Sequence, residues 1–418
     1  MNMNELIYDW NQIGQANPVP DHAIYLNDET LRDGLQSPSV SDPPVEKKIE
    51  LLHLMEALGI HSLNIGLPGA GGTHARAVGR LAREIADQKM KIWPNCLART
   101  DWRDITPVIE IAQRSGIPIE VAIFVGSSPL RFYAEDWTLD QLLRLTQESV
   151  TFAVKEGLPV MFATEDTSRS TPETLRALFT AAIQCGATAL GVADTVGHAT
   201  PDGARSLARF VREIAVEQGA EIRIDWHGHQ DRGLGVINSL AALEGGANRI
   251  HGTALGIGER VGNTPMDQML VNLKLMGWID NDLSLLGQYC ATAAAACGWT
   301  IPPNYPVFGR DAFRTATGIH AAALIKSYKK GDTALADVIY SSVPASLFGQ
   351  RQVIEIGPMS GKSNVIYWLE THGFEVTEER VSRVYDYAKQ SSSVLEEYQV
   401  TNLLQEEMPA ATALSSRS

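Results

Sequence analysis

Over roughly the first two thirds of this chain, the hydrophobic residues follow two alternating spacings. Short runs rich in β-branched residues, typical of strands, are each followed by a longer segment with apolar residues three and four positions apart, typical of a helix. The predicted strands cover residues 23–28, 62–67, 91–97, 119–125, 160–164, 189–193, 222–226 and 249–253. The helices that follow them cover residues 44–58, 73–89, 101–115, 139–156, 171–185, 201–217, 235–243 and 265–276.

Eight strand–helix units joined by short connections favour a parallel sheet that closes into a barrel. The alternative is an open, doubly wound sheet, which usually has fewer strands and a glycine-rich dinucleotide fingerprint. Residues 66–72 are glycine-rich after a strand, but they lack the fingerprint spacing and the later ribose-binding acid. The pattern therefore predicts an α/β fold, a (β/α)8 TIM barrel over residues 23–277.

After about Trp278 the alternation stops and helical spacing continues alone, in residues 283–294, 321–328 and 378–398. We therefore expect a mainly helical C-terminal lid region over residues 278–404. Residues 1–22 form a polar leader, and the small polar residues 405–418 are predicted to be a disordered tail.

Composition narrows the possible partners and the compartment. The chain has 418 residues, 44% of them hydrophobic, and a net charge of −14, which disfavours nucleic acid and anionic membranes as partners. The four cysteines have neither the spacing of a metal site nor that of a disulfide framework, so we expect reduced thiols. We see no signal peptide and no apolar run long enough to span a membrane. A cytoplasmic protein that acts on small molecules is expected.

The candidate chemistry lies where the predicted strands end, because catalytic residues of such barrels gather at the carboxyl ends of the strands. His227 and His229 end the seventh strand, and two residues two apart on a strand share a face. Alone, they are equally well explained as surface histidines of a loop. Together with a carboxylate and an amide oxygen or water, they suit Mg, Mn or Zn. The same rim collects Asp28, Arg32, Asp33, Asn95, Arg99, Ser127, Ser128, Glu165, Asp166, Asp194, Thr195, Glu259, Arg260 and Asn263.

Three motifs carry a family resemblance. They are Leu31-Arg32-Asp33-Gly34-x-Gln36, His227-Gly228-His229-x-Asp231-x-Gly233 and Gly256-x-Gly258-Glu259-Arg260-x-Gly262-Asn263. Together they resemble the 2-isopropylmalate, homocitrate and citramalate synthases, metal-dependent acyl-CoA condensing barrels that are related to hydroxymethylglutaryl-CoA lyase. The resemblance extends to Thr317-Gly318-Ile319-His320 and Met359-Ser360-Gly361-Lys362 in the helical region.

The resemblance implies a divalent metal and a set of ligands. The positions that match the family's metal ligands are Asp33, His227, His229 and Asn263. Arg32 matches an arginine that stabilises the developing charge on the carbonyl oxygen, with a structural ion pair as the alternative. Thr195 matches a threonine that binds the carboxylate of a 2-oxo acid, with a helix N-cap as the alternative.

Further roles follow from the same resemblance. Glu165 and His320 match the candidate general bases, and the sequence does not say which of them takes the proton. His320 matches a histidine that the helical region of a neighbouring subunit supplies, which implies a homodimer. Tyr340 resembles, more loosely, a tyrosine of the same lid. The loop that holds Gly256, Gly258 and Gly262 is placed either against the CoA phosphates or in a purely conformational role.

The implied reaction is a Claisen-type condensation of acetyl-CoA with a 2-oxo acid, which gives a 2-hydroxy-dicarboxylic acid and CoA. A 2-isopropylmalate synthase-like enzyme is the first expectation, with homocitrate or citramalate synthase possible. The alternatives are lyase or aldolase-type cleavage of a carbon–carbon bond on the same barrel, and a catalytically silent barrel that has lost a metal ligand.

Several positions depart from the family pattern. Gln230 replaces an asparagine, Leu35 a glutamate and Thr315 a second histidine. Met161 stands where homocitrate synthases place an arginine, which favours a 2-oxo acid with an apolar tail, such as 2-oxoisovalerate, or pyruvate. Arg131, which follows Ser127 by four positions, is a candidate replacement for that charge. Because the sequence stops before the long C-terminal domain of leucine-inhibited relatives, we expect no leucine feedback through such a domain.

Overall fold

A computed structural model describes residues 6–12 and 20–405 of the chain. The chain divides into two compact units, a barrel unit over Asp9–Thr300 and a C-terminal unit from Ile301 onward that also includes the residues up to Tyr8. The predicted disordered tail lies outside the described residues, apart from Gln405, which ends a helix. Most of the predicted leader also lies outside them.

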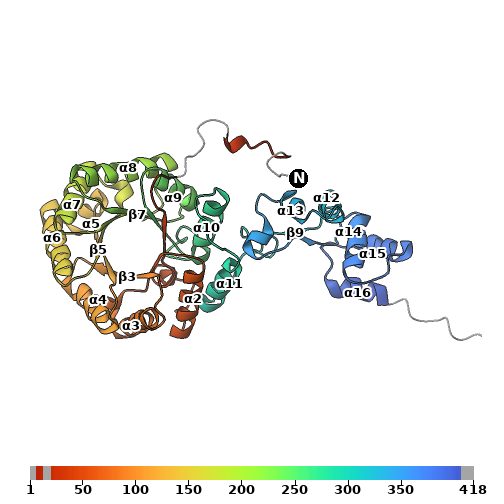
Figure 1. The fold of residues 1–418 in the computed structure, drawn as a ribbon, viewed down its shortest axis with the longest axis horizontal. Helices are drawn as coiled ribbons and strands as arrows, with labels where there is room; N and C mark the ends of the chain where they lie inside the picture. The colour runs from red at the N-terminus through yellow and green to blue at the C-terminus, as the bar shows by residue number, and fades with distance from the viewer. Residues whose placement is uncertain (1–5, 13–19, 406–418) are drawn as a thin grey trace, which may run out of the picture. The chain divides into compact units, whose positions relative to one another are not determined.

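The barrel unit contains eight parallel strands that pair in sequence order and close, β8 pairing with β1. A ring of helices surrounds these strands (Figure 1). The strands are β1 (Tyr25–Asp28), β2 (Ser62–Asn64), β3 (Trp93–Arg99), β4 (Glu120–Gly126), β5 (Val160–Glu165), β6 (Ala189–Asp194), β7 (Arg223–Gly228) and β8 (Arg249–Gly252). The helices that follow them are α2 (Val45–Ala57), α3 (Gly72–Asp87), α4 (Trp102–Ser115), α6 (Leu139–Lys155), α7 (Pro172–Gln184), α8 (Pro201–Glu217), α9 (Gly235–Glu244) and α10 (Met266–Leu275). The predicted TIM barrel is confirmed, and a short extra helix, α5 (Pro129–Glu135), precedes α6.

Capping residues fix where several of the barrel helices begin and end. The side chains of Asp101, Thr138 and Thr200 accept backbone N–H hydrogen bonds at the starts of α4, α6 and α8. Gly116 ends α4 with φ at 72°, a left-handed conformation that favours glycine. These capping residues define the ends of the helices. They therefore keep short the loops in which the polar residues near the strand ends lie.

The lower part of the barrel interior is charged, whereas barrels of this kind usually fill it with branched apolar side chains. Nη2 of Arg249 lies 2.5 Å from Oδ2 of Asp225 and 2.6 Å from Oε2 of Glu120. Nε of Arg223 lies 2.8 Å from Oδ1 of Asp225. Burial opposes ionisation of Glu120, but the guanidinium groups of Arg249 and Arg223 hold its pKa below the ordinary value. Arg249, Asp225 and Glu120 are therefore buried, and Arg223 partly buried, each beside its opposite charge, the condition under which buried charges are tolerated.

The C-terminal unit is mainly helical and has its own core. It contains α12 (Gly318–Lys329), α13 (Thr333–Val338), α14 (Lys362–Thr371), α15 (Glu378–Gln390) and α16 (Glu397–Gln405). A short parallel pair, β9 (Arg314–Thr315) and β10 (Val353–Ile354), was not predicted. Val365, Leu369 and Val384 belong to a buried cluster between α14, α15 and α16. The segment 378–398, which was predicted as one helix, contains α15 and the beginning of α16. The two are separate because Ser391 adopts an extended conformation after α15.

The division between the two units falls later than the boundary predicted after residue 277. Helix α11 (Leu286–Cys297) belongs to the barrel unit, where it packs against α2. The backbone N–H of Ser41 also donates to the carbonyl oxygen of Cys297 at 3.0 Å. Loss of the strand–helix alternation therefore does not mark the end of the compact unit. None of the helices in the described ranges is both long and apolar enough to cross a membrane.

Candidate metal and substrate site

Three predicted metal ligands meet at the mouth of the barrel. Nε2 of His227, on β7, lies 3.2 Å from Nε2 of His229 and 3.4 Å from Oδ2 of Asp33, which follows β1. The distance from His229 Nε2 to the same carboxylate oxygen is 3.9 Å. Two ligand atoms about 2.1 Å from one ion, at tetrahedral or octahedral angles, lie roughly 3.0–3.4 Å apart. This geometry fits one shared divalent cation.

Unpaired polar atoms support the same interpretation. Oδ1 of Asp33, Nδ1 of His229 and both side-chain polar atoms of Asn263 are buried without a hydrogen-bond partner among the described residues. Asn263 forms an isolated antiparallel bridge with His229, which places the fourth predicted ligand beside the histidines. Buried polar groups are normally satisfied, so orphaned atoms at this point indicate a missing partner. The residues present therefore fit a divalent metal.

The glycines of the predicted CoA loop have a conformational role. Gly256 and Gly262 have φ of 68° and 96°, and a Cβ at Gly262 would come 1.8 Å from the carbonyl oxygen of Gly256. A Cβ at Gly258 would come 2.2 Å from Nδ2 of Asn263. The loop therefore closes tightly around Asn263 only because these positions lack side chains. Contact with CoA phosphates stays a prediction.

Arg32 is held by two carboxylates at the cavity wall. Its Nη1 lies 2.9 Å from Oδ2 of Asp33, and its Nη2 donates to Glu29. Burial alone would raise the pKa of Asp33, but Arg32, together with His227 and His229, holds it well below the ordinary value. The structural ion pair considered for Arg32 is therefore present, and the guanidinium also lines the cavity. Its role toward a substrate stays a prediction.

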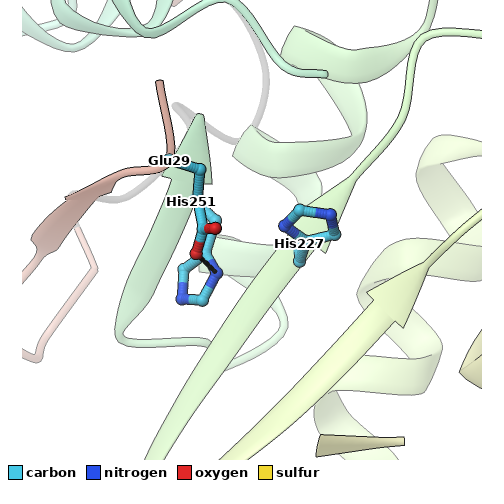
Figure 2. A group of neighbouring side chains, drawn as sticks. All are labelled: Glu29, His227 and His251. Atoms are coloured by element: carbon cyan, nitrogen blue, oxygen red, sulfur yellow. Dashed lines mark ion pairs between the residues drawn. The ribbon is translucent and has the colours of Figure 1, made fainter. Parts of the chain in front are cut away.

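Glu29 and His251 are site residues that the sequence analysis missed (Figure 2). Nδ1 of His251 lies 3.1 Å from Oε1 of Glu29, and its Nε2 lies 3.4 Å from Oδ2 of Asp225. Glu29, His227 and His251 also form a group that could hold a metal ion. Burial opposes the charged form of His251, but Asp225 and Glu29 outweigh it and raise the pKa. Because both ring nitrogens of His251 already face carboxylates, the Asp33 group is the better metal site.

A cavity of about 250 Å³ joins the metal cluster to four of the other predicted residues. Met161, Glu165 and Thr195 line it together with Arg32, Asp33 and both histidines of the cluster. Oγ1 of Thr195 accepts the backbone N–H of Asp166 at 2.8 Å. The N-cap of α8 is Thr200, so the alternative interpretation of Thr195 as a cap of that helix is wrong.

Ser127 and Arg131 lie behind Glu165, outside the lining of the cavity. Oγ of Ser127 donates to the backbone oxygen of Glu165 at 3.0 Å, and Nε of Arg131 lies 3.5 Å from Oε1 of Glu165. Burial raises the pKa of Glu165, although Arg131 opposes the shift. Both residues therefore act on the position and charge of Glu165. Direct substrate contact by either stays a prediction.

His320 and Tyr340 come together in the C-terminal unit. Their rings stack with centroids 4.2 Å apart and an interplanar angle of 30°, and both side chains are exposed. The stack joins the start of α12 to the segment after α13. The two predicted lid residues are thus neighbours, while their action on a substrate stays a prediction.

Stability of the metal-free protein is expected to fall in mild acid because of His229. Burial, helped by the neighbouring His227, lowers the pKa of His229 from 6.5 to about 4. Between these values the unfolded chain binds a proton that the folded protein does not, so unfolding becomes easier as the pH decreases. The loss is on the order of 2–3 kcal/mol between pH 6.5 and 4. Urea unfolding in the presence of a chelator measures it, and a His229→Gln variant should lack this part of the pH dependence.

The fold and the rim cluster define the class of the protein: it is a (β/α)8 barrel of the kind that enzymes use, and the cluster at its rim fits a metal ion. Residues 23–292 match the HMGL-like family, and the chain belongs to it. It is 32% identical over 369 residues to the homocitrate synthase AksA of Methanopyrus kandleri, covering 88% of this chain and 87% of that protein. It is 31% identical over 370 residues to the 2-isopropylmalate synthase of Pyrococcus abyssi, covering 87% and 73%. The family resemblance predicted from the motifs is confirmed.

A solved structure shares the fold. The HMG-CoA lyase of Bacillus subtilis is 20% identical and superposes with a TM-score of 0.55, covering 68% of this chain and 97% of that chain. The chain is thus a member of an enzyme family that includes synthases similar to it along most of its length.

Proposed function

We propose that this protein catalyses a metal-dependent Claisen-type condensation of acetyl-CoA with a 2-oxo acid, which yields an alkylmalate-type 2-hydroxy-dicarboxylic acid and CoA. The observation that carries the proposal is the convergence of Asp33, His227 and His229 on the wall of the cavity that Arg32 and Glu165 also line. Relatives named as synthases cover 87% or more of the chain. In this proposal the enzyme is an acyltransferase that acts as a cytoplasmic homodimer.

A divalent cation, when bound by Asp33, His227, His229 and Asn263, would polarise the keto group of the 2-oxo acid. Arg32 would donate to the oxygen on which negative charge develops, an oxyanion-type role. The hydroxyl of Thr195 already accepts the N–H of Asp166, which leaves its hydrogen free to donate to the substrate carboxylate.

The general base must remove a proton from the methyl group of acetyl-CoA. Glu165 lines the cavity, and its raised pKa brings it closer to the range in which a carboxylate is an effective base. His320 is the second candidate, supplied in the proposed dimer by the C-terminal unit of the other copy. The new carbon–carbon bond joins the acetyl methyl carbon to the keto carbon, and water then cleaves the thioester to release the CoA thiol.

The tail of the 2-oxo acid is proposed to be apolar, as in a 2-isopropylmalate synthase. Met161 lines the cavity, whereas Arg131 does not. Arg131 instead lies 3.5 Å from Glu165 and 3.3 Å from Glu135, so its charge is already compensated. An anionic tail such as that of 2-oxoglutarate would therefore meet no free positive charge from either position.

The test is release of the CoA thiol from acetyl-CoA with a panel of 2-oxo acids, before and after treatment with EDTA. We expect release that needs a 2-oxo acid, falls to background with EDTA and returns on addition of Mg, Mn or Zn. Cleavage of hydroxymethylglutaryl-CoA, without release in the panel, would instead support the lyase alternative. Release that is unchanged by a chelator would contradict the assigned role of the cluster.

A further inference from the structure

The two sides of the cavity differ in chemistry. The metal cluster, with Arg32, Glu29 and His251, lies on the side formed by β7, β8 and β1. The opposite side, formed by β3 to β6, carries Thr164, Glu165 and Thr195 at the carboxyl ends of its strands, and below them it presents Leu97, Ala122, Phe124, Met161, Ala163, Gly191 and Ala193. We propose that this apolar side selects a 2-oxo acid whose side chain is larger than isopropyl, in the size range of isobutyl to benzyl. This inference rests on the proposed condensation and deepens it.

The floor of the apolar side carries almost no side-chain atoms. Ala122 pairs in register with Met161, and Ala163 pairs with Gly191 on the next strand. A Cβ added at Gly191 would come 2.7 Å from the Cβ of Ala163, so this position needs glycine for β5 and β6 to converge. Ala163 is partly exposed and opens to the cavity beside Gly191, whereas Ala122 is fully buried against Met161 and Ala189. A floor of larger side chains, by contrast, would suit a short tail.

The walls around this floor are apolar and large. Leu97 and Phe124 line the cavity from β3 and β4, and Met161 lines it from β5. Sδ of Met161 lies 3.5 Å from Nη2 of Arg249, whose charge is paired with Asp225 and Glu120. Arg249 itself is 1% exposed and does not line the cavity. The walls thus offer a tail apolar contact, and Asp225 is the member of the charged network beneath that also lines the cavity.

The cavity must hold both the head and the tail of the keto acid. Its volume of about 250 Å³ extends from the metal cluster across the apolar side. Apolar contact strengthens binding by about fourfold for each buried CH2 group. Because the keto acid head must reach the metal cluster, each carbon added to the tail extends over the alanine and glycine floor. The preferred substrate should therefore be one that covers this floor.

The test compares kcat/KM for CoA release with 2-oxo acids that share one head group. Pyruvate, 2-oxoisovalerate, 4-methyl-2-oxopentanoate, phenylpyruvate and 2-oxoglutarate supply methyl, isopropyl, isobutyl, benzyl and carboxyethyl tails. We expect the highest value with the isobutyl or benzyl tail, about fourfold or more above isopropyl. A maximum at methyl, isopropyl or carboxyethyl would overturn this inference and leave the proposed condensation intact. Absence of release with every acid would overturn both.

An Ala163→Leu variant tests where the tail lies. Leucine would occupy the floor, so the ratio of kcat/KM for the preferred bulky acid to that for pyruvate should fall about 10- to 200-fold. Ala163→Val, which adds less volume, should lower the same ratio by a smaller factor. The matched control is Val121→Ile, which adds a methyl group at a fully buried position of β4 outside the cavity lining and should leave the ratio unchanged. A ratio that does not change in folded Ala163→Leu would overturn the placement.

Discussion

Replacing His227 with alanine should lower metal-dependent release of CoA by about 10³-fold or more. His227 lies close to two other proposed metal ligands. Its Nε2 is 3.2 Å from Nε2 of His229 and 3.4 Å from Oδ2 of Asp33. A Lewis acid at this point contributes several kcal/mol of stabilisation to a developing charge, and each 1.4 kcal/mol is about tenfold in rate. The variant should also lose bound metal after dialysis, measured as metal per chain.

The matched control for this loss is His53→Ala. His53 lies on the outer helix α2 and pairs with Glu84 at 3.0 Å. Its replacement removes an exposed imidazole of the same size, so release and metal content should match those of the unmodified protein. A His227→Ala protein that keeps both its metal and its rate would contradict the assigned site.

Replacing Arg32 with alanine should lower kcat by about 10²- to 10³-fold while metal remains bound, because one oxyanion donor is worth that much. The variant also leaves Glu29 and Asp33 without their buried counter-charge, which costs about 3–5 kcal/mol of stability. Measurements of kcat, metal content and unfolding midpoint therefore report different consequences of one substitution.

A second substitution separates these consequences. Adding Glu29→Gln to Arg32→Ala removes one of the two uncompensated carboxylates and should recover part of the stability. Recovery of stability without recovery of kcat indicates that Arg32 acts on the reacting oxygen. Recovery of both would mean that Arg32 has only the structural role of an ion pair. Arg205→Ala, on α8 with partners Asp202 and Glu244, is the surface control and should leave kcat unchanged.

Much of the fold could be predicted because each strand and helix of the barrel unit has its own local pattern. Strand β7 and helix α9, for example, lie within a residue or two of the predicted ranges. The place of α11 could not be predicted, because it depends on packing against α2, far away in the sequence. The short pairing of β9 with β10 is too brief to leave a period-two pattern.

The metal cluster could be predicted because parallel strands deliver their carboxyl ends to one rim, so Asp33 and His227 meet although they lie far apart in the sequence. Glu29 and His251 were missed because a barrel interior is expected to be apolar there. The sequence did contain a signal for them. Asn27 pairs with His251 in register, and Glu29 follows Asn27 by two positions, so these side chains belong to the same face of neighbouring strands. The position of Asn263 depends on a loop that closes through Gly256 and Gly262 at positive φ, which a motif alone does not describe.

The apolar lining of β4, β5 and β6, which lies apart from the metal cluster, has a consequence for how an enzyme with the proposed function can diversify. Residues such as Ala122, Ala163 and Gly191 make no ion pair with the carboxylates and imidazoles of the opposite side. Substitutions at Ala163 can accumulate without removing a ligand or Arg32, whereas Gly191 is restricted by the close Cβ of Ala163. Under the proposed condensation, a lineage that carries this barrel can exchange one 2-oxo acid for another by changes around Ala163, while the residues proposed to carry the reaction stay the same.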